Sequence, residues 1–191
     1  MLNKDSRGGL RSLGSQLPVA YETSNANLID EFVVPALSVS KAYDRASGYF
    51  RSSVYHLIGV AMSEFALNGG KLRLICSPSL TTRDWKIIEE NHPPERQEID
   101  RAIEKNIEDA LSDPASKDCT VFLATLLQHQ ILDLRLCYKP KEPGIFHTKL
   151  GVFSDGTDRI SFTGSNNETY LGWLENEERF HVFPSWRSED H

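Results

Sequence analysis

The chain has 191 residues, of which 39% are hydrophobic and 25% are charged, a composition typical of one globular domain with a sizeable core. No apolar run reaches the roughly 18 residues of a membrane span, and the polar first residues lack the apolar core of a signal peptide. We therefore expect a cytoplasmic protein with no membrane partner. The net charge of −6 argues against nucleic-acid binding over the whole surface but leaves room for a local basic groove.

The cysteines and histidines give no sign of a metal site. Cys76, Cys119 and Cys137 are widely spaced and form no CxxC pair, and no HExxH motif is present. A metal centre would need closer ligand spacing, and cysteines within apolar runs are typical of buried structural thiols. We therefore expect neither a metal nor another cofactor.

The chain opens with a polar segment and a first helix. Residues 1–17 are rich in glycine, serine and charge and are expected to form a flexible arm. Residues 28–37 carry apolar side chains at helical spacing, with Asn25 or Asn27 as the candidate cap. Pro35 is expected to end or kink this helix.

A strand–helix–strand unit follows. Residues 43–50 alternate, with one face made of Ala46, Gly48 and Phe50 and the other of Arg45, Ser47 and Tyr49. A helix that Ser52 or Ser53 caps runs to Leu67, where Asn68-Gly69-Gly70 ends it, and residues 71–77 form the next strand. This order predicts a right-handed crossover and parallel pairing.

The remaining segments predict helices first and strands afterwards. Helices are expected from Thr81 or Thr82, over 95–111, and over 120–130, and strands over 132–138, 146–153, 159–163 and 178–183. The whole pattern predicts an α/β domain over residues 18–186 with a mixed sheet, followed by a tail over 187–191.

His147 and Lys149 are the first candidate site residues. Two positions apart on a strand, they share one face, while Thr148, Leu150 and Val152 share the other. Such a strand can line a pocket with a nucleophile and a cation. A surface strand that exposes two polar residues would show the same short pattern.

The turn Gly164-Ser165-Asn166-Asn167 supplies neutral hydrogen-bond donors. It ends one strand, and residues 168–174 after it are helix-like, so Ser165 and Asn167 are expected near a helix N-terminus. Backbone N–H groups and the helix dipole favour an anion there. An ordinary capping turn is the alternative interpretation.

Glu178 is the candidate orienting carboxylate. On a strand it shares a face with Phe180 and Val182, whereas His181 lies on the opposite face. A carboxylate that hydrogen-bonds one nitrogen of His147 would fix the tautomer and stabilise the imidazolium. An acidic surface stretch is the alternative.

Together, His147-x-Lys149 and Gly164-Ser165-x-Asn167 resemble the HKD motif of the phospholipase D superfamily, and Glu178 stands where nuclease members have a glutamate. The chain also resembles, over residues 27–186, the nuclease-type domains fused to DEAD/DEAH-type helicases in bacterial restriction and phage-defence proteins. The resemblance implies a phospholipase D-like mixed sheet flanked by helices on both faces. The superfamily's motif aspartate would fall on Ser154, with Asp155 one position later.

The resemblance also implies a mechanism and partners. His147 would attack phosphorus to give a phosphohistidine, Lys149, Ser165 and Asn167 would hold the phosphate oxygens, and Glu178 would orient His147. In the family, the leaving group receives its proton from a second copy of the motif, but this sequence contains only a single copy. We therefore expect a homodimer sharing one active site, with DNA as substrate and a helicase or ATPase as a possible partner.

Two alternatives to a metal-independent DNA phosphodiesterase remain open. The acidic charge and the displaced aspartate favour a weak or silent module that serves DNA binding or complex assembly with a helicase. Lipid hydrolysis is disfavoured, because the sequence contains no basic amphipathic helix for a membrane surface.

Overall fold

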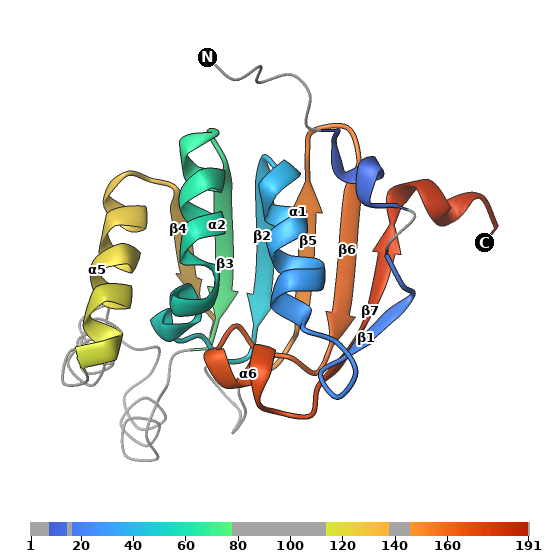
Figure 1. Cartoon of the computed structure of the whole chain (residues 1–191). Coiled ribbons are helices and arrows are strands. Elements are labelled where there is room, and N and C mark those ends of the chain that lie inside the picture. The colour runs from blue at the N-terminus through green and yellow to red at the C-terminus, as the bar shows by residue number, and fades with distance from the viewer. Residues whose placement is uncertain (1–7, 15–16, 78–113, 138–145, 191) are drawn as a thin grey trace.

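The computed structural model describes residues 8–14, 17–77, 114–137 and 146–190, and it contains one seven-stranded sheet with the order β1-β7-β6-β5-β2-β3-β4 (Figure 1). The strands are β1 (Ala20–Glu22), β2 (Ala42–Ser47), β3 (Lys71–Cys76), β4 (Leu132–Leu136), β5 (Leu150–Ser154), β6 (Arg159–Gly164) and β7 (Arg179–Pro184). β2, β3 and β4 pair in parallel, and the other pairs are antiparallel. The expected α/β class with a mixed sheet is confirmed.

The described α-helices are α1 (Val34–Val39), α2 (Tyr55–Leu67), α5 (Pro114–Gln128) and the short α6 (Tyr170–Leu174). α1, α2 and α5 lie on the same face of the sheet, with α2 in contact with both others (Figure 1). Helices were expected on both faces, and those of the described residues cover this face. The helices expected from Thr81 or Thr82 and over 95–111 lie outside the described residues. Of the described helices, none combines the length and apolarity that crossing a membrane requires.

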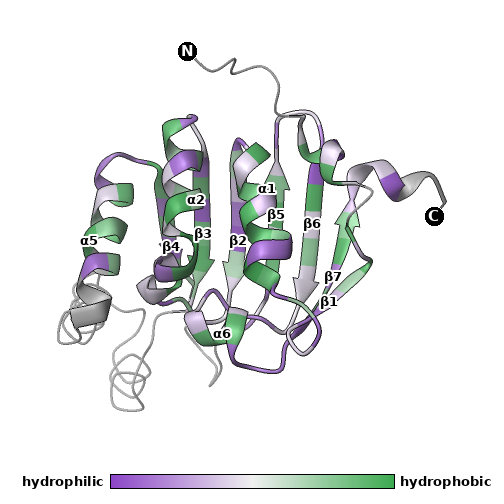
Figure 2. Cartoon of the chain, viewed as in Figure 1, coloured by the Kyte–Doolittle hydropathy of each residue, from purple (hydrophilic) through white to green (hydrophobic). Residues whose placement is uncertain are grey.

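An aromatic cluster forms the centre of the core between this helical layer and the sheet. Phe32, from the turn before α1, packs at ring-centroid distances of 5.0–5.8 Å against Phe153, Phe162 and Phe180 of three adjacent strands. Trp173 of α6 lies 5.9 Å from Phe180. The bands of alternating hydropathy along the strands in Figure 2 follow from the two-residue period of a strand. Because the aromatic residues of the cluster face the helices, the side chains two positions away on each strand face them too.

The inward face of β2 is polar rather than apolar. Tyr43, Arg45 and Ser47 are buried, whereas Ala46 is only half-buried on the opposite face. Burying an arginine and a serine is costly unless both find hydrogen-bond partners, and here they find them in the segment between β6 and α6. The expected strand over 43–50 also ends earlier, at Ser47.

The first helix continues through Pro35 instead of ending there. A π-helical turn over Ile29–Val33 precedes α1, which ends at Val39. The wider turn accommodates a proline, which has no N–H and whose ring would clash with the carbonyl four residues earlier in an α-helix. Asn27 is the cap, since its Oδ1 accepts hydrogen bonds from the N–H groups of Ile29 and Asp30 at 3.2 and 3.3 Å.

The expectation of a flexible arm over 1–17 is wrong for residues 10–13. Leu10–Leu13 form a 3₁₀ turn in which Leu10 is fully buried, and the Leu10 N–H donates to Asp155 Oδ2 at 2.7 Å. β1, which the sequence did not predict, then pairs with β7. Arg187, in the expected tail, donates to the carbonyl oxygens of Gly14 and Leu17. Both ends of the described chain are therefore packed together.

Candidate active site

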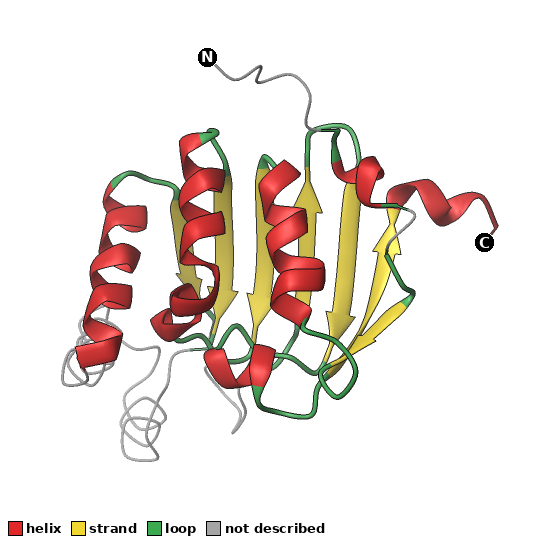
Figure 3. Cartoon of the chain, in the orientation of Figure 1, coloured by secondary structure: helices red, strands yellow, loops and turns green. Residues whose placement is uncertain are grey.

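All five predicted site residues lie at one edge of the sheet. This edge holds the carboxyl ends of β2 and β6 and the amino ends of the antiparallel β5 and β7, and the loops that join them run along the lower side of Figure 3. The residues concerned are His147, Lys149, Ser165, Asn167 and Glu178.

Gly48 is the point at which three of these side chains converge. A Cβ atom at Gly48 would lie 2.8 Å from His147 Cδ2, 3.0 Å from Lys149 Nζ and 3.1 Å from Asn167 Oδ1. Any side chain at position 48 would therefore collide with this group. Gly48 was not among the predicted site residues, although a glycine within a strand pattern does signal close approach of other groups.

Lys149 supplies a partly desolvated cation. The strand expected over 146–153 begins only at Leu150, so Lys149 directly precedes β5 and its side chain continues the inward face of that strand. It is 7% exposed, and its Nζ donates to the His147 carbonyl oxygen at 3.1 Å. Burial lowers the pKa of Lys149 below its ordinary value; the carboxylate of Glu178 opposes this and the charge of Arg45 adds to it. A poorly solvated ammonium interacts strongly with any anion that enters beside it.

Glu178 is buried close enough to influence Lys149. It is 9% exposed and, as expected, shares the inward face of β7 with Phe180. Its Oε1 accepts a hydrogen bond from Asn176 Nδ2 at 3.2 Å, and its backbone is joined to Thr23, whose Oγ1 accepts from the Glu178 N–H at 2.9 Å. In this described part of the chain, no hydrogen bond joins Glu178 to His147.

The hydroxyl of Ser165 is directed to β7. It accepts a hydrogen bond from the Arg179 N–H at 3.1 Å and donates to the Arg179 carbonyl oxygen at 3.4 Å. The expected helix begins later than residue 168, because Thr169 is the cap of α6 and its Oγ1 accepts from the Gly172 N–H at 3.0 Å. Ser165 therefore joins β6 to β7 in this structure rather than lying at the helix N-terminus.

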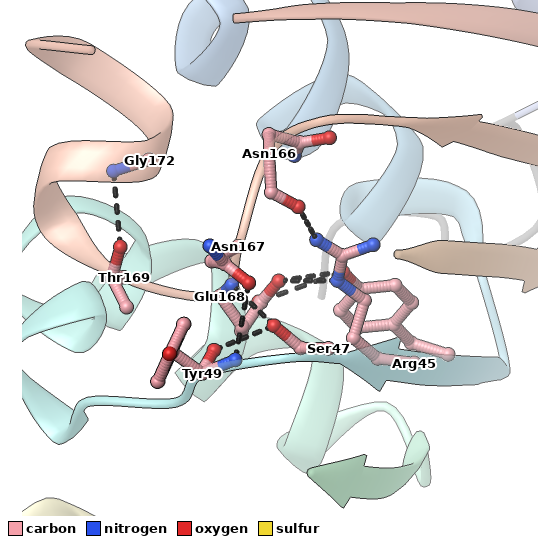
Figure 4. A network of polar contacts seen from close by, with 9 residues as sticks. Arg45, Ser47, Tyr49, Asn166, Asn167, Glu168, Thr169 and Gly172 are labelled. Carbon is pink, nitrogen blue, oxygen red and sulfur yellow. Dashed lines mark hydrogen bonds and ion pairs between the residues drawn. The ribbon is translucent and has the colours of Figure 1, made fainter. Parts of the chain in front are cut away.

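A buried ion pair holds the loop that carries Asn167 (Figure 4). Arg45 Nε donates to Glu168 Oε2 at 2.7 Å, and Arg45 Nη2 donates to the Asn166 carbonyl oxygen at 2.7 Å. The two charged side chains are 0% and 6% exposed. Tyr43 adds a hydroxyl 3.3 Å from Glu168 Oε2. Neither charged residue was predicted from the sequence, because each lies in a stretch that also suits a solvated surface.

Ser47 and Tyr49 extend this network to the site. The Glu168 N–H donates to Ser47 Oγ at 2.7 Å, Ser47 Oγ donates to the Tyr49 carbonyl oxygen at 2.6 Å, and the Tyr49 N–H donates to Asn167 Oδ1 at 3.1 Å (Figure 4). The amide oxygen of Asn167 is thus used internally. Its Nδ2, which makes no hydrogen bond to another described residue, can donate to a ligand.

Asp155 lies at the opposite edge of the sheet, in the turn between β5 and β6. Its Oδ1 accepts hydrogen bonds from the N–H groups of Thr157 and Asp158, both at 2.8 Å, and its Oδ2 binds Leu10. Burial raises the pKa of this carboxyl, but the hydrogen bonds from Asp158, Thr157 and Leu10 outweigh it, so the pKa is lowered. Asp155 therefore organises a turn and does not contact the site.

No protein-family model and no curated protein sequence matches the chain. Among solved structures it is similar to phosphatidylserine synthase from Haemophilus influenzae, with a TM-score of 0.53 and 12% identity over 86% of this chain and 34% of the synthase. It is also similar to NucT from Helicobacter pylori, with a TM-score of 0.46 and 16% identity over 85% of this chain and 82% of NucT.

A third similar structure is Nuc, a phospholipase D family member from Salmonella typhimurium, with a TM-score of 0.44 and 14% identity over 78% of this chain and 71% of Nuc. At such identities a structural likeness concerns the fold, and function has to be argued from the site. The match to the synthase, of which this chain spans about a third, supports the mixed α/β architecture.

Proposed function

We propose that the chain is a metal-independent phosphodiesterase that cleaves DNA through a phosphohistidine on His147. The observation that carries the proposal is the convergence of His147, Lys149 and Asn167 around Gly48. A nucleophile, a partly desolvated cation and a free amide donor in one place are the groups that attack on a phosphate diester requires.

The reaction divides into two displacements. A ring nitrogen of His147 attacks phosphorus, the P–N bond forms, and the P–O bond to the leaving strand breaks. Lys149 Nζ and Asn167 Nδ2 stabilise the non-bridging oxygens as their charge grows, and Ser165 would join them by exchanging its bond to the Arg179 carbonyl. Water then attacks the phosphohistidine and releases the histidine. Glu178, buried on the same side as Lys149, would stabilise the positive charge on the site.

The leaving oxygen needs a proton from a second histidine. His181 does not supply it to this site, because it lies on the opposite, exposed face of β7 from Glu178. We therefore include in the proposal a homodimer in which the His147 side chains of two protomers meet at one shared site. The resemblance in sequence further suggests a role in bacterial restriction or phage defence beside a helicase.

The proposal is tested with a labelled oligonucleotide in EDTA, using wild type, His147→Ala and the matched control His181→Ala. We expect cleavage by wild type and by the control, loss of at least about 10³-fold in His147→Ala, and a labelled protein band after quenching in alkaline detergent, in which a P–N bond survives, that His147→Ala lacks. Sedimentation of the wild type should give the mass of a dimer. Full activity of His147→Ala, or complete loss of wild-type cleavage in EDTA, would contradict the proposal.

Two observations favour a second candidate, a weak or silent module for DNA binding or assembly with a helicase. Ser165 is bound to Arg179, and Glu178 is not hydrogen-bonded to His147 in the described structure. This candidate predicts a protein that binds DNA with unchanged affinity in His147→Ala but produces no cleavage under any condition. The same assay, read beside a binding titration, decides between the two.

A further inference from the structure

Tyr49 places an exposed aromatic ring beside His147 of the candidate site. The side chain is 42% exposed, and its ring lies 5.9 Å from the His147 ring at an interplanar angle of 80°. Most aromatic side chains of the described residues are buried in the core. This ring instead presents surface to solvent directly beside the proposed nucleophile.

The backbone that carries this ring is held on both sides. The Tyr49 N–H donates to Asn167 Oδ1 at 3.1 Å, and its carbonyl oxygen accepts from Ser47 Oγ at 2.6 Å (Figure 4). Ser47 is fully buried. Because the position of the ring is tied to the network that positions Asn167, a group bound to Tyr49 is held in a fixed place relative to the reacting phosphate.

A cation accompanies the ring two residues later. Arg51 is exposed and extended, with φ −140° and ψ 131°, and its N–H donates to the Glu168 carbonyl oxygen at 3.1 Å. Between the two, Phe50 is half-buried and packs against Tyr55 at 6.1 Å. Since successive residues of an extended segment point to opposite sides, the exposed Tyr49 and Arg51 lie together on the side away from the half-buried Phe50.

We propose that Tyr49 is a stacking platform for an unpaired base that flanks the phosphate at His147, and that Arg51 binds a neighbouring phosphate. The substrate class is therefore single-stranded nucleic acid. In a duplex both faces of a base are covered by its neighbours, whereas an unpaired base can stack on an aromatic side chain while a cation follows the backbone. This inference rests on the proposed function for the position of the phosphate.

Binding is measured first, because it does not depend on turnover. His147→Asn, which keeps a planar polar side chain beside Tyr49, is titrated at low salt with oligo(dT) and with an abasic oligonucleotide of the same length and charge. We expect tighter binding of oligo(dT). Adding Tyr49→Leu should reduce this preference by about 5- to 150-fold, the value of one stacked base, while Tyr49→Phe should retain it.

Two controls separate stacking from charge. Phe183→Leu removes another exposed aromatic side chain, 55% exposed on β7, and should leave the preference unchanged. Arg51→Gln should weaken binding of both oligonucleotides equally and reduce the slope of log affinity against log salt by about 0.7. Equal binding of the two oligonucleotides, or a preference that survives Tyr49→Leu, would overturn the inference.

Cleavage is the second measurement and distinguishes the two proposals. Wild type should cleave a single strand faster than the same sequence in a duplex, and Tyr49→Leu should lose most of that difference. If wild type cleaves nothing but the binding preference depends on Tyr49, the proposed chemistry fails while the stacking site stands. If wild type cleaves both substrates equally and Tyr49→Leu is fully active, the stacking site fails while the chemistry stands.

Discussion

Gly48 shows how a missing side chain can build a site, because the space it leaves lets three side chains from two other segments approach one another. We predict that Gly48→Ala lowers cleavage by at least about 10²-fold, since the new methyl group displaces His147, Lys149 and Asn167. The free energy of unfolding should change far less, because the displaced atoms are the ends of flexible side chains. Rates and urea unfolding curves measure the two effects.

Gly59 is the matched control for this substitution. It lies within α2, and a Cβ atom there would meet nothing within 4 Å. Gly59→Ala should leave cleavage unchanged and stabilise the protein by about 0.5–1 kcal/mol, because alanine loses less backbone entropy in a helix. Equal activity in the two variants would show that the convergence at Gly48 has no catalytic role.

The lowered pKa of Lys149 predicts an alkaline limit to activity. Its charge is partly desolvated, so the folded state holds the proton less tightly than an unfolded lysine with the ordinary value of 10.5. The resulting cost to stability is present at neutral pH and disappears as pH rises through the folded pKa toward 10.5. Cleavage should therefore decline with a midpoint below 10.5, which a pH–rate profile measures.

Glu178 opposes this shift, so its charge should move the same midpoint. Glu178→Gln is expected to lower the pKa of Lys149 further, because it removes the carboxylate that favours the ammonium. Glu177→Gln, on the exposed neighbouring residue, should have no effect. Side-chain NMR of ¹³C-labelled lysine reads the titration without requiring activity, and an unchanged Lys149 midpoint in Glu178→Gln would refute the assignment.

At the scale of elements, the Arg45–Glu168 pair joins the end of β2 to the segment between β6 and α6. Removing one partner leaves the other charge buried without compensation, so Arg45→Met should destabilise the protein by about 3–5 kcal/mol. Combining it with Glu168→Leu should recover much of this stability but not the cleavage rate, because Asn167 is no longer positioned. Urea unfolding and cleavage rates test both statements.

Asp44 and Arg73 offer an exposed pair on two adjacent strands as the control. Their side chains are 36% and 69% exposed, and exposed pairs contribute about 0–1 kcal/mol. Asp44→Asn should therefore change neither stability nor cleavage appreciably. A double variant of the buried pair that is both stable and fully active would mean that the pair contributes to folding alone.

Most helices and strands could be predicted because each combines a periodic pattern of apolar residues with a residue signal that marks its end. The helix that ends at Leu67 is followed by Gly69, whose φ of +82° completes the expected glycine cap. The π-helical turn before Pro35 and the three residues of β1 have no comparable signal. Their formation depends on packing against Phe180 and pairing with β7, which are contacts between distant parts of the chain.

Only the residue types of the candidate site, and the strand faces on which they lie, could be predicted from the sequence. The inward positions of Lys149 and Glu178 follow from the period of two, whereas His147 is exposed and lies before β5, which begins at Leu150. The convergence at Gly48 does not, because it requires β2 to lie beside β5. The polar inward face of β2 was likewise hidden, since alternation cannot show that Arg45 has a buried partner more than a hundred residues away.

Across the whole molecule, the two edges of the sheet have different tasks. The site occupies one edge, and Asp155 holds Leu10 and the β5–β6 turn at the other. Asp155→Asn should lower the free energy of unfolding by about 1–3 kcal/mol through weakened hydrogen bonds and leave cleavage unchanged. Urea unfolding and cleavage rates at neutral pH make the comparison, with the exposed Asp133→Asn as the control.

The pH dependence of that destabilisation has a definite sign. The pKa of Asp155 is below the ordinary value of 3.8, so its contribution is present above 3.8 and is lost as pH falls through the folded pKa. The gap in stability between wild type and Asp155→Asn should therefore close in acid. A cleavage rate that falls in Asp155→Asn at neutral pH would show that the two edges are coupled.

Pairing of β1 with β7 brings Ala20 opposite His181 and places Thr23 against the backbone of Glu178. This pairing joins strands near the two ends of the described chain, and contacts between segments that are distant in sequence slow folding. The consecutive strands β5, β6 and β7 bring Lys149 and Glu178 into one short stretch of the chain, whereas Gly48 reaches them only through the pairing of β2 with β5. The candidate site is therefore complete only when the amino-terminal and carboxyl-terminal parts of the chain have joined one sheet.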